Sequence, residues 1–294
     1  MPNARDFSHA LGGRWHGQYG TAPCPVCQPQ RRKDQNALTV ANGTDGRLLL
    51  HCKKTHCAFR DILAAAGVTV SSFGPPDQET LDMREAARRA EIEKKSRHAQ
   101  RVWQEALPIL GTAAETYLRE ARGITCALPP TLRFHPACWH KFAQRVPAMV
   151  GLIEGGDGIA VHRTYLRHDG SGKANLDGGD KLMLGPARGG AVRLARANGP
   201  IVVGEGIETT LSALVLQGNK KASAWAALST SGMATLRLPS QPGELILAPD
   251  GDKAGRGSAF ALADRAARDG WTVSILTPPK GGDFNDILMS EVAK

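Results

Sequence analysis

Short apolar runs alternate with longer amphipathic segments over the last third of the chain. The apolar runs predict strands at 201–203, 222–228, 244–248 and 272–276, and the segments between them predict helices at 208–217 and 254–268. Alternating strands and helices are typical of a parallel sheet with helices on its faces. In such sheets the ligand site lies at the carboxyl ends of the strands, so the loops that follow the strands are the first place to look for chemistry.

The middle of the chain has a different pattern, with short apolar stretches divided by glycine and aspartate. These stretches predict strands at 149–153, 159–166, 182–184 and 191–194, after a short helix at 111–123. Residues 111–199 are therefore predicted to form a compact, partly β subdomain. Ahead of it, a Ser, Gly and Pro linker at 71–76 and a charged helix at 80–107 make residues 71–110 a connector.

Residues 1–70 form a first unit, which is rich in turn residues and poor in large apolar side chains. Leu48 to Leu50 predict a short strand, and Asp61 begins a short helix that Gly67 ends. Four of the six cysteines cluster here: Cys24 and Cys27 form a CxxC pair, and Cys52 and Cys57 form a second pair. Two such pairs can bind zinc tetrahedrally, and a small unit with few apolar residues gains stability from a metal.

The zinc ligands leave one choice open. His56 stands beside Cys57 and could replace it in a site of three cysteines and one histidine. Ordinary free thiols, or a redox pair at Cys24 and Cys27, are the alternatives to zinc, but a redox pair leaves the second cysteine pair without a role. A closed four-ligand site would be structural.

Carboxylates follow three of the predicted elements of the last domain. Glu205 follows the first strand, Asp250 and Asp252 follow the third, and Asp283 and Asp286 come after the last. Acidic groups that converge at one edge of a sheet repel unless cations lie between them, and Mg²⁺ or Mn²⁺ would resolve that repulsion.

Each acidic residue also has a plainer interpretation. Asp283 and Asp286 could simply begin a final short helix, and Glu208 could stabilise a helix N-terminus as well as bind metal. An EF-hand is excluded because positions 254 and 261 are both alanine. A haloacid dehalogenase-type phosphatase would leave Glu205 without a role.

Charge is distributed unevenly along the chain. Of 37 Lys and Arg and 28 Asp and Glu, residues 1–200 hold 28 and 18, a net +10, and residues 201–294 hold 9 and 10, a net −1. The basic part suits a polyanion such as nucleic acid, whereas the acidic part suits metal ions.

The motif of strand, Glu205 and Gly206, followed about 40 residues later by a strand and the Asp250-Gly251-Asp252 triplet, resembles the Toprim domain of primases, topoisomerases and some nucleases. The resemblance covers residues 200–294 and is strongest to phage and plasmid primases, with Asp283 similar to a third acidic motif. Replicative bacterial primases carry an aspartate where this chain has Thr209. The resemblance implies Glu205, Asp250 and Asp252 as the catalytic residues, and these together with Asp283 and Asp286 as Mg²⁺ or Mn²⁺ ligands.

The order of a zinc-binding module, a basic subdomain and a Toprim domain is also similar to that of primases. By this resemblance, Arg163, Lys173 and Lys181 in the basic subdomain, and Lys53 and Lys54 in the zinc module, face the template or the nucleotide phosphates. The implied fold is α/β, with a C-terminal Toprim domain, a small α+β basic subdomain before it and a β-rich zinc module at the N-terminus.

The function predicted from these features is a DNA primase that makes short RNA primers on single-stranded DNA from ribonucleoside triphosphates. A Toprim-type metal-dependent nuclease and a non-catalytic nucleic-acid-binding adaptor are the alternatives. The Gly172-Lys173-Ala174 stretch does not complete a P-loop, so a helicase or other replication protein would be a separate partner. No apolar run reaches the roughly 18 residues of a membrane helix, and no signal peptide is seen, so a cytoplasmic protein is expected.

Overall fold

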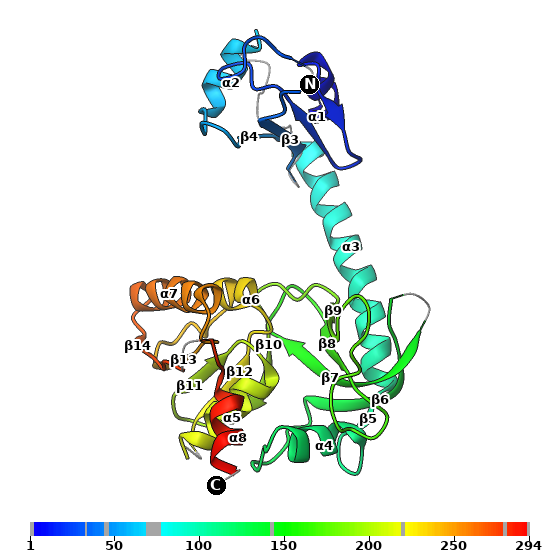
Figure 1. Cartoon of the computed structure of the whole chain (residues 1–294), viewed down its shortest axis with the longest axis vertical. Helices are drawn as coiled ribbons and strands as arrows, with labels where there is room; N and C mark the ends of the chain where they lie inside the picture. The colour runs from blue at the N-terminus through cyan, green and yellow to red at the C-terminus, as the bar shows by residue number, and fades with distance from the viewer. Residues whose placement is uncertain are drawn as a thin grey trace. The chain divides into compact units, whose positions relative to one another are not determined.

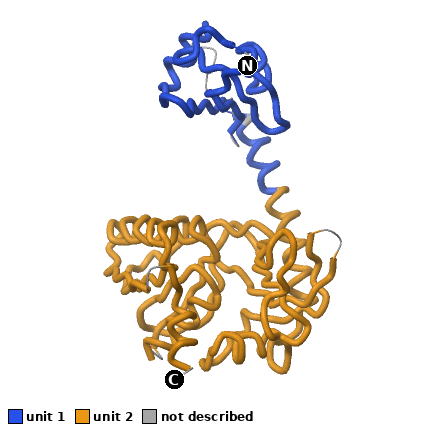
Figure 2. The backbone as a smooth tube through the Cα atoms, viewed as in Figure 1, with its two compact units in different colours: residues 1–89 blue, residues 90–294 orange. Residues whose placement is uncertain are grey.

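The computed structural model describes residues 3–32, 34–43, 47–68, 78–141, 144–218, 221–278 and 281–292. The chain divides into two compact units, Met1–Arg89 and Ala90–Lys294, here called unit 1 and unit 2 (Figure 2). The linker predicted at 71–76 lies outside the described residues. None of the described helices combines the length and the apolarity needed to span a bilayer.

Unit 1 contains a four-stranded antiparallel sheet in the order β1-β2-β3-β4, with a helix before it and a helix after it. Its elements are α1 (Ala4–Ala10), β1 (Arg14–Trp15), β2 (Tyr19–Ala22), β3 (Leu38–Asn42), β4 (Leu48–Cys52) and α2 (Phe59–Ala65). Phe7 of α1, Leu38 and Val40 of β3, and Ile62 and Leu63 of α2 are buried together in a small core. The predicted strand at 48–50 and the short helix that follows it are confirmed.

Helix α3 (Gln78–Glu105) confirms the predicted charged helix, and ion pairs four residues apart, such as Glu91–Lys95 at 3.3 Å, run along its surface. Near its end, α3 buries Ala99 completely and packs Val102 against the strands of unit 2.

Unit 2 is built on one ten-stranded mixed sheet. Its first part contains β5 (Leu107–Pro108), α4 (Ala113–Thr116), the π-helical turn η2 (Tyr117–Ala121), β6 (Leu132–Trp139), β7 (Arg145–Glu154), β8 (Ala160–Tyr165), β9 (Lys181–Leu184) and β10 (Ala191–Ala195). Neighbouring strands in this part are antiparallel. The predicted helix at 111–123 is thus two short segments, and β6 is a strand that the sequence pattern did not predict.

The second part of unit 2 confirms the alternation of strands and helices. It contains β11 (Ile201–Gly204), α5 (Ile207–Leu216), β12 (Ser223–Ala226), α6 (Thr230–Thr235), β13 (Glu244–Ala248), α7 (Lys253–Arg268), β14 (Thr272–Ile275) and α8 (Phe284–Val292). The four strands lie in the order β14-β13-β11-β12 and are parallel. Strand β10 then pairs antiparallel with β12, so the two parts share one sheet.

The helices of the second part cover both faces of these parallel strands (Figure 1). On one face α6 and α7 pack against the strands through Met233, Leu262 and Leu247. On the other face α5 and α8 lie together, and Leu211 and Leu288 join the core of the preceding part. The helices cover the two faces of the parallel strands, and the loops that follow these strands meet at the edge formed by the strands' carboxyl ends.

Candidate functional site

The loops that carry Glu205 and Asp250 begin at the same level of the sheet. Strands β11 and β13 are parallel neighbours in which Gly204 pairs with Ala248, so Glu205 and the Pro249–Asp250 segment leave their strands side by side. The convergence that the sequence predicted follows from this register, because parallel neighbours place their carboxyl ends at one edge.

Glu205 is the most enclosed of these acids. Its side chain is 9% exposed, and its buried Oε1 atom has no hydrogen-bond partner among the described residues. Burial, and the negative charges of Asp250 and Asp252, raise the pKa of Glu205 to about 7. A buried carboxylate oxygen without a partner, in a field of other carboxylates, fits a bound cation.

Gly255 allows this close packing. A Cβ atom at position 255 would lie 2.5 Å from Glu205 Oε1 and 2.6 Å from the carbonyl oxygen of Asp250. The first turn of α7 can therefore approach both acidic loops only because this residue has no side chain.

The two aspartates after β13 differ in their surroundings. Asp252 is exposed and is the N-cap of α7, where its Oδ1 accepts a hydrogen bond from the backbone N–H of Gly255 at 2.6 Å. Asp250 is half-buried, and burial together with the charge of Asp283 raises its pKa, although the Lys181 ammonium opposes the shift.

Both carboxylates of the third acidic segment cap a helix, and one of them, Asp283, also reaches the acidic loops. Thr209 Oγ1 lies 3.4 Å from both Asp250 Oδ1 and Asp283 Oδ2, so it bridges the two loops. Asp286 instead accepts a hydrogen bond from the Asp283 N–H at 3.0 Å, and Asp283 Oδ1 accepts one from the Asp286 N–H at 2.9 Å. Asp283 and the exposed Asp286 thus both begin α8, which is the role that the sequence left as an alternative for the pair.

Lys181 and Lys173 both interact electrostatically with Glu208, and Lys181 also interacts with Asp250. The ammonium of Lys181 forms an ion pair with Glu208 at 2.9 Å, and its positive charge opposes the rise in the pKa of Asp250. Lys173 is half-buried nearby, and burial followed by the positive charge of Lys181 lowers its pKa. Lys181 therefore links Lys173 electrostatically to the acidic loops.

Arg163 lies on the other face of the sheet from Lys181, and its contact with the template or the nucleotide phosphates stays a prediction. It is 7% exposed, its guanidinium donates a hydrogen bond to the Trp139 carbonyl at 2.9 Å, and it lies 5.7 Å from the centre of the Tyr165 ring. Arg163 is next to His162 in β8, so the two side chains point to opposite faces of the sheet. The pKa of His162 is influenced by the charges of Lys181 and Glu208, so that face is the one nearer the acidic loops. Arg163 instead lines a basic cavity of about 690 Å³ that also contains Arg101 and Arg145.

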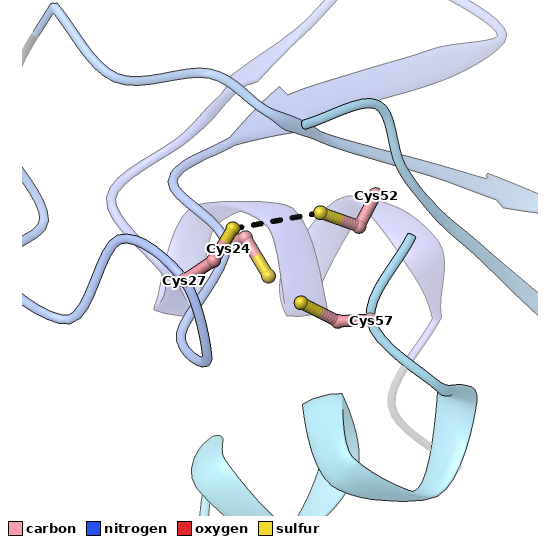
Figure 3. A group of neighbouring side chains, drawn as sticks. All are labelled: Cys24, Cys27, Cys52 and Cys57. Carbon is pink, nitrogen blue, oxygen red and sulfur yellow. Dashed lines mark hydrogen bonds between the residues drawn. The ribbon is translucent and has the colours of Figure 1, made fainter. Parts of the chain in front are cut away.

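The four cysteines of unit 1 come together as predicted (Figure 3). The Sγ atoms of Cys24, Cys27, Cys52 and Cys57 all lie within 4.8 Å of one another, with Cys27 and Cys52 at 3.6 Å. Tetrahedral zinc holds its sulfur ligands about 3.8 Å apart, so the cluster fits one metal ion. Burial raises the pKa of Cys24 to about 12, whereas backbone N–H groups around Cys52 outweigh its burial and lower its pKa to about 5.

His56 is not part of this cluster. It is exposed, with a left-handed backbone at φ 51°, and its ring lies 5.7 Å from the ring of His51. Cys57 therefore completes the set, and the open choice between the two residues is resolved. Lys53 and Lys54 lie exposed in the turn that follows β4, between the two cysteines of the second pair.

Within the described ranges, the cysteines are the one group of three or more His, Cys, Asp or Glu residues gathered within 4.8 Å. The carboxylates of Glu205, Asp250 and Asp252 influence one another electrostatically, but they do not form such a group among the described residues. Metal ligation by these acids stays a prediction, which the partnerless Glu205 oxygen supports.

Several polar residues near the site were not assigned from the sequence. Tyr117, Arg122 and Asn285 are hydrogen-bonded into one network with Glu208. Tyr117 lies 91 residues before Glu208 and shares no motif with it, so no local signal could have paired them.

Comparison with known proteins agrees with this description. Residues 200–294 match the profile of the Toprim domain, and residues 93–194 match a domain of unknown function, DUF7146. The chain thus ends in a Toprim domain, and its fold is α/β with a four-cysteine cluster near the N-terminus. A search of curated proteins found no match.

Similar solved structures come from bacterial and phage primases. The zinc-binding and RNA polymerase domains of the Aquifex aeolicus primase are 13% identical with a TM-score of 0.42, and the alignment covers 99% of this chain and 80% of that one. The primase fragment of the bacteriophage T7 primase-helicase is 13% identical with a TM-score of 0.36, and 95% of each chain is covered. A third structure is of the bacteriophage T7 lagging-strand DNA polymerase with primase domains bound to an RNA/DNA hybrid. Its sequence identity is 14% and its TM-score is 0.34, and the alignment covers 63% of this chain and 86% of that one.

Proposed function

We propose that this chain is a DNA primase that synthesises short RNA primers on single-stranded DNA by metal-dependent nucleotidyl transfer. The observation that carries the proposal is the order of three parts in one chain. A four-cysteine cluster comes first, a basic domain second and a Toprim domain last, with Glu205 and Asp250 at the edge that the parallel strands share. The residues before position 201 supply the positive charge for the template, and the proposed location is the cytoplasm.

The acidic loops would hold one or two Mg²⁺ or Mn²⁺ ions through Glu205, Asp250 and Asp252, with Asp283 close to Asp250. Such ions supply charge neutralisation at the attacking and leaving oxygens of a phosphoryl transfer. Asp286, which is exposed and whose carboxylate accepts a hydrogen bond from the Asp283 N–H, is the weakest of the proposed metal ligands.

The cations of the basic domain have a separate task. Lys181 and Lys173 would bind the phosphates of the incoming ribonucleoside triphosphate and so hold it against the acidic loops. Arg163 would act on the other face of the sheet, where its cavity suits the template strand rather than the reacting phosphates.

Unit 1 would bind the template. Its four cysteines would hold a structural Zn²⁺, and the exposed Lys53 and Lys54 would contact the phosphate backbone. The proposal includes a helicase or another replication protein as a separate partner.

The test is primer synthesis on single-stranded DNA with labelled ribonucleotides and Mg²⁺. Asp250→Ala and Glu205→Gln should each reduce synthesis by at least about a hundredfold, because they remove charge from the proposed metal site. Asp264→Asn, which changes an exposed acid on α7, is the matched control and should retain full activity. Full synthesis by either site variant would refute the assignment.

The same preparations distinguish the alternative functions. A metal-dependent nuclease would cut the DNA without added ribonucleotides, and a non-catalytic adaptor would bind DNA but neither cut nor extend it. Either result from the wild-type chain would replace the primase proposal.

A further inference from the structure

Glu208 is a buried carboxylate whose two side-chain hydrogen-bond partners come from outside its own helix. It lies in the first turn of α5 and is 5% exposed. Its Oε1 accepts a hydrogen bond from the Tyr117 hydroxyl at 2.8 Å, and its Oε2 accepts one from the Lys181 ammonium at 2.9 Å. Tyr117 belongs to η2 and Lys181 to β9, so one Toprim side chain binds two elements of the preceding domain.

The residues behind Glu208 form a closed network. The Tyr117 hydroxyl accepts a hydrogen bond from Arg122 Nε at 3.0 Å, and Arg122 donates to Asn285 Oδ1 at 3.2 Å. Asn285 donates to Ser212 Oγ at 3.0 Å, and the Ser212 hydroxyl donates to the carbonyl oxygen of Glu208 at 2.9 Å. Because each polar group has a partner, the carboxylate is fixed in position.

This arrangement bears on both roles that the sequence left open for Glu208. The N-cap of α5 is Gly206, without a side-chain cap hydrogen bond, and Glu208 lies in the first turn, where its negative charge favours the helix N-terminus. Each of its carboxylate oxygens accepts a hydrogen bond, one from Tyr117 and one from Lys181, so its charge is paired within the protein.

Lys181 interacts with two acidic residues. Its ammonium forms an ion pair with Glu208, and its positive charge also favours the ionised form of Asp250. A lysine side chain is long and flexible, and without a fixed partner its ammonium would pair with the nearest carboxylate. Pairing with Asp250 would place a protein cation where the proposed metal ion must bind.

We propose that Glu208 is a positioning residue, which holds the Lys181 ammonium beside the acidic loops but away from Asp250, so that Lys181 meets the phosphates of a bound nucleotide. Tyr117 orients Glu208 for this task through its hydroxyl. The inference rests on the proposed function, since it assumes a nucleotide ligand at the acidic loops. It gives the domain of residues 93–194 a defined part in the site, through Tyr117 and Lys181.

The test measures binding of a fluorescent ATP analogue to the full-length chain as Mg²⁺ is titrated. Glu208→Gln should weaken nucleotide binding about tenfold and raise the Mg²⁺ concentration needed for half-saturation, because a charged hydrogen bond is lost and Lys181 competes for Asp250. Tyr117→Phe should shift both quantities in the same direction by a smaller factor. Glu154→Gln, which breaks the 2.7 Å surface ion pair with Arg196, is the matched control and should leave both unchanged.

A double-mutant cycle separates positioning from a merely structural role. Lys181→Met should itself weaken nucleotide binding, and adding Glu208→Gln should then cause no further loss, because the residue through which Glu208 acts is gone. The inference would be overturned if Glu208→Gln weakened nucleotide binding as much in the Lys181→Met background as in the wild type. It would also be overturned if Glu208→Gln alone bound nucleotide as tightly as the wild type. If Glu208→Gln fails to fold by circular dichroism, the Tyr117→Phe cycle decides in the same way.

The binding assay requires no primer synthesis. A wild-type chain that binds nucleotide with Mg²⁺ but makes no primers would refute the proposed function and leave the role of Glu208 intact. Unchanged binding by both variants, in a chain that makes primers, would refute only the role of Glu208.

Discussion

Glu205 illustrates how one residue can be unfavourable for folding and suited to function. Its partnerless oxygen and the neighbouring aspartates raise its pKa from an ordinary 4.5 to about 7. Below pH 4.5 the side chain is protonated in both the folded and the unfolded chain and has no effect on stability. As the pH rises from 4.5 to 7, the unfolded chain loses this proton more readily, so the folded chain becomes less stable.

Glu205→Gln should therefore stabilise the protein when Mg²⁺ and Mn²⁺ are absent. We expect the free energy of unfolding of unit 2 to rise by up to about 3 kcal/mol at pH 8 and to stay unchanged at pH 4.5, as measured by urea denaturation. Saturating Mg²⁺ should reduce the difference at pH 8, because the ion stabilises the wild type. A difference that does not depend on pH would contradict this account.

Gly255 is a second residue whose role depends on its neighbours. Gly255→Ala should reduce primer synthesis at least about tenfold, because the new methyl group would displace Glu205 or the Asp250 loop. Gly257→Ala, two residues further along α7, has open space around the new methyl group and is the control. It should retain activity and gain about 0.5–1 kcal/mol of stability from the helix preference of alanine. Equal activity of the two variants would show that Glu205 tolerates displacement.

At the level of elements, the sequence predicted the parallel half of unit 2 well and the antiparallel half less completely. Strands β11 and β13 are uninterrupted apolar runs, and both were predicted together with the loops that carry the acids. Strand β6 was missed because Pro136 interrupts it, and the register shifts between His135 and Cys138. The turn η2 lies inside the helix predicted at 111–123, but its π-helical geometry was not predicted, because such single turns are local irregularities within helices.

The metal cluster is the element on which unit 1 depends most. Its core is small, and the sulfur atoms join the CxxC turn to the end of β4. Cys27→Ser should reduce bound zinc from one ion per chain to well below one, and should make unit 1 sensitive to protease while unit 2 stays resistant. Cys126→Ser, outside the cluster, is the control. Elemental analysis and limited proteolysis measure the two effects, and full zinc retention by Cys27→Ser would contradict the assignment.

At the scale of the whole molecule, the site depends on contacts that the sequence could not reveal. Glu205, Asp250 and Asp252 were predictable because they follow apolar strands. The partners of Glu208 were not, because the fold brings Tyr117 to it across 91 residues. The face of the sheet that Arg163 occupies was not predictable for a similar reason, since only the pairing of β8 shows it. Motifs predict the chemistry of a site, whereas packing decides which cations reach it.

The uneven charge of the chain leads to a prediction for the complete protein on single-stranded DNA. Each cation that contacts a phosphate releases counterions, so the logarithm of the affinity falls with the logarithm of salt concentration by about 0.7 per contact. Replacing both Lys53 and Lys54 with glutamine should therefore reduce the slope by about 1.4, which fluorescence anisotropy can measure between low and moderate salt. The control is Arg268→Gln. Arg268 is exposed on α7, within residues 201–294, whose net charge is −1, and its replacement should leave the slope unaltered. If the Arg268 change reduced the slope as much as the lysine pair, the template would bind across the Toprim domain instead of along the basic part of the chain.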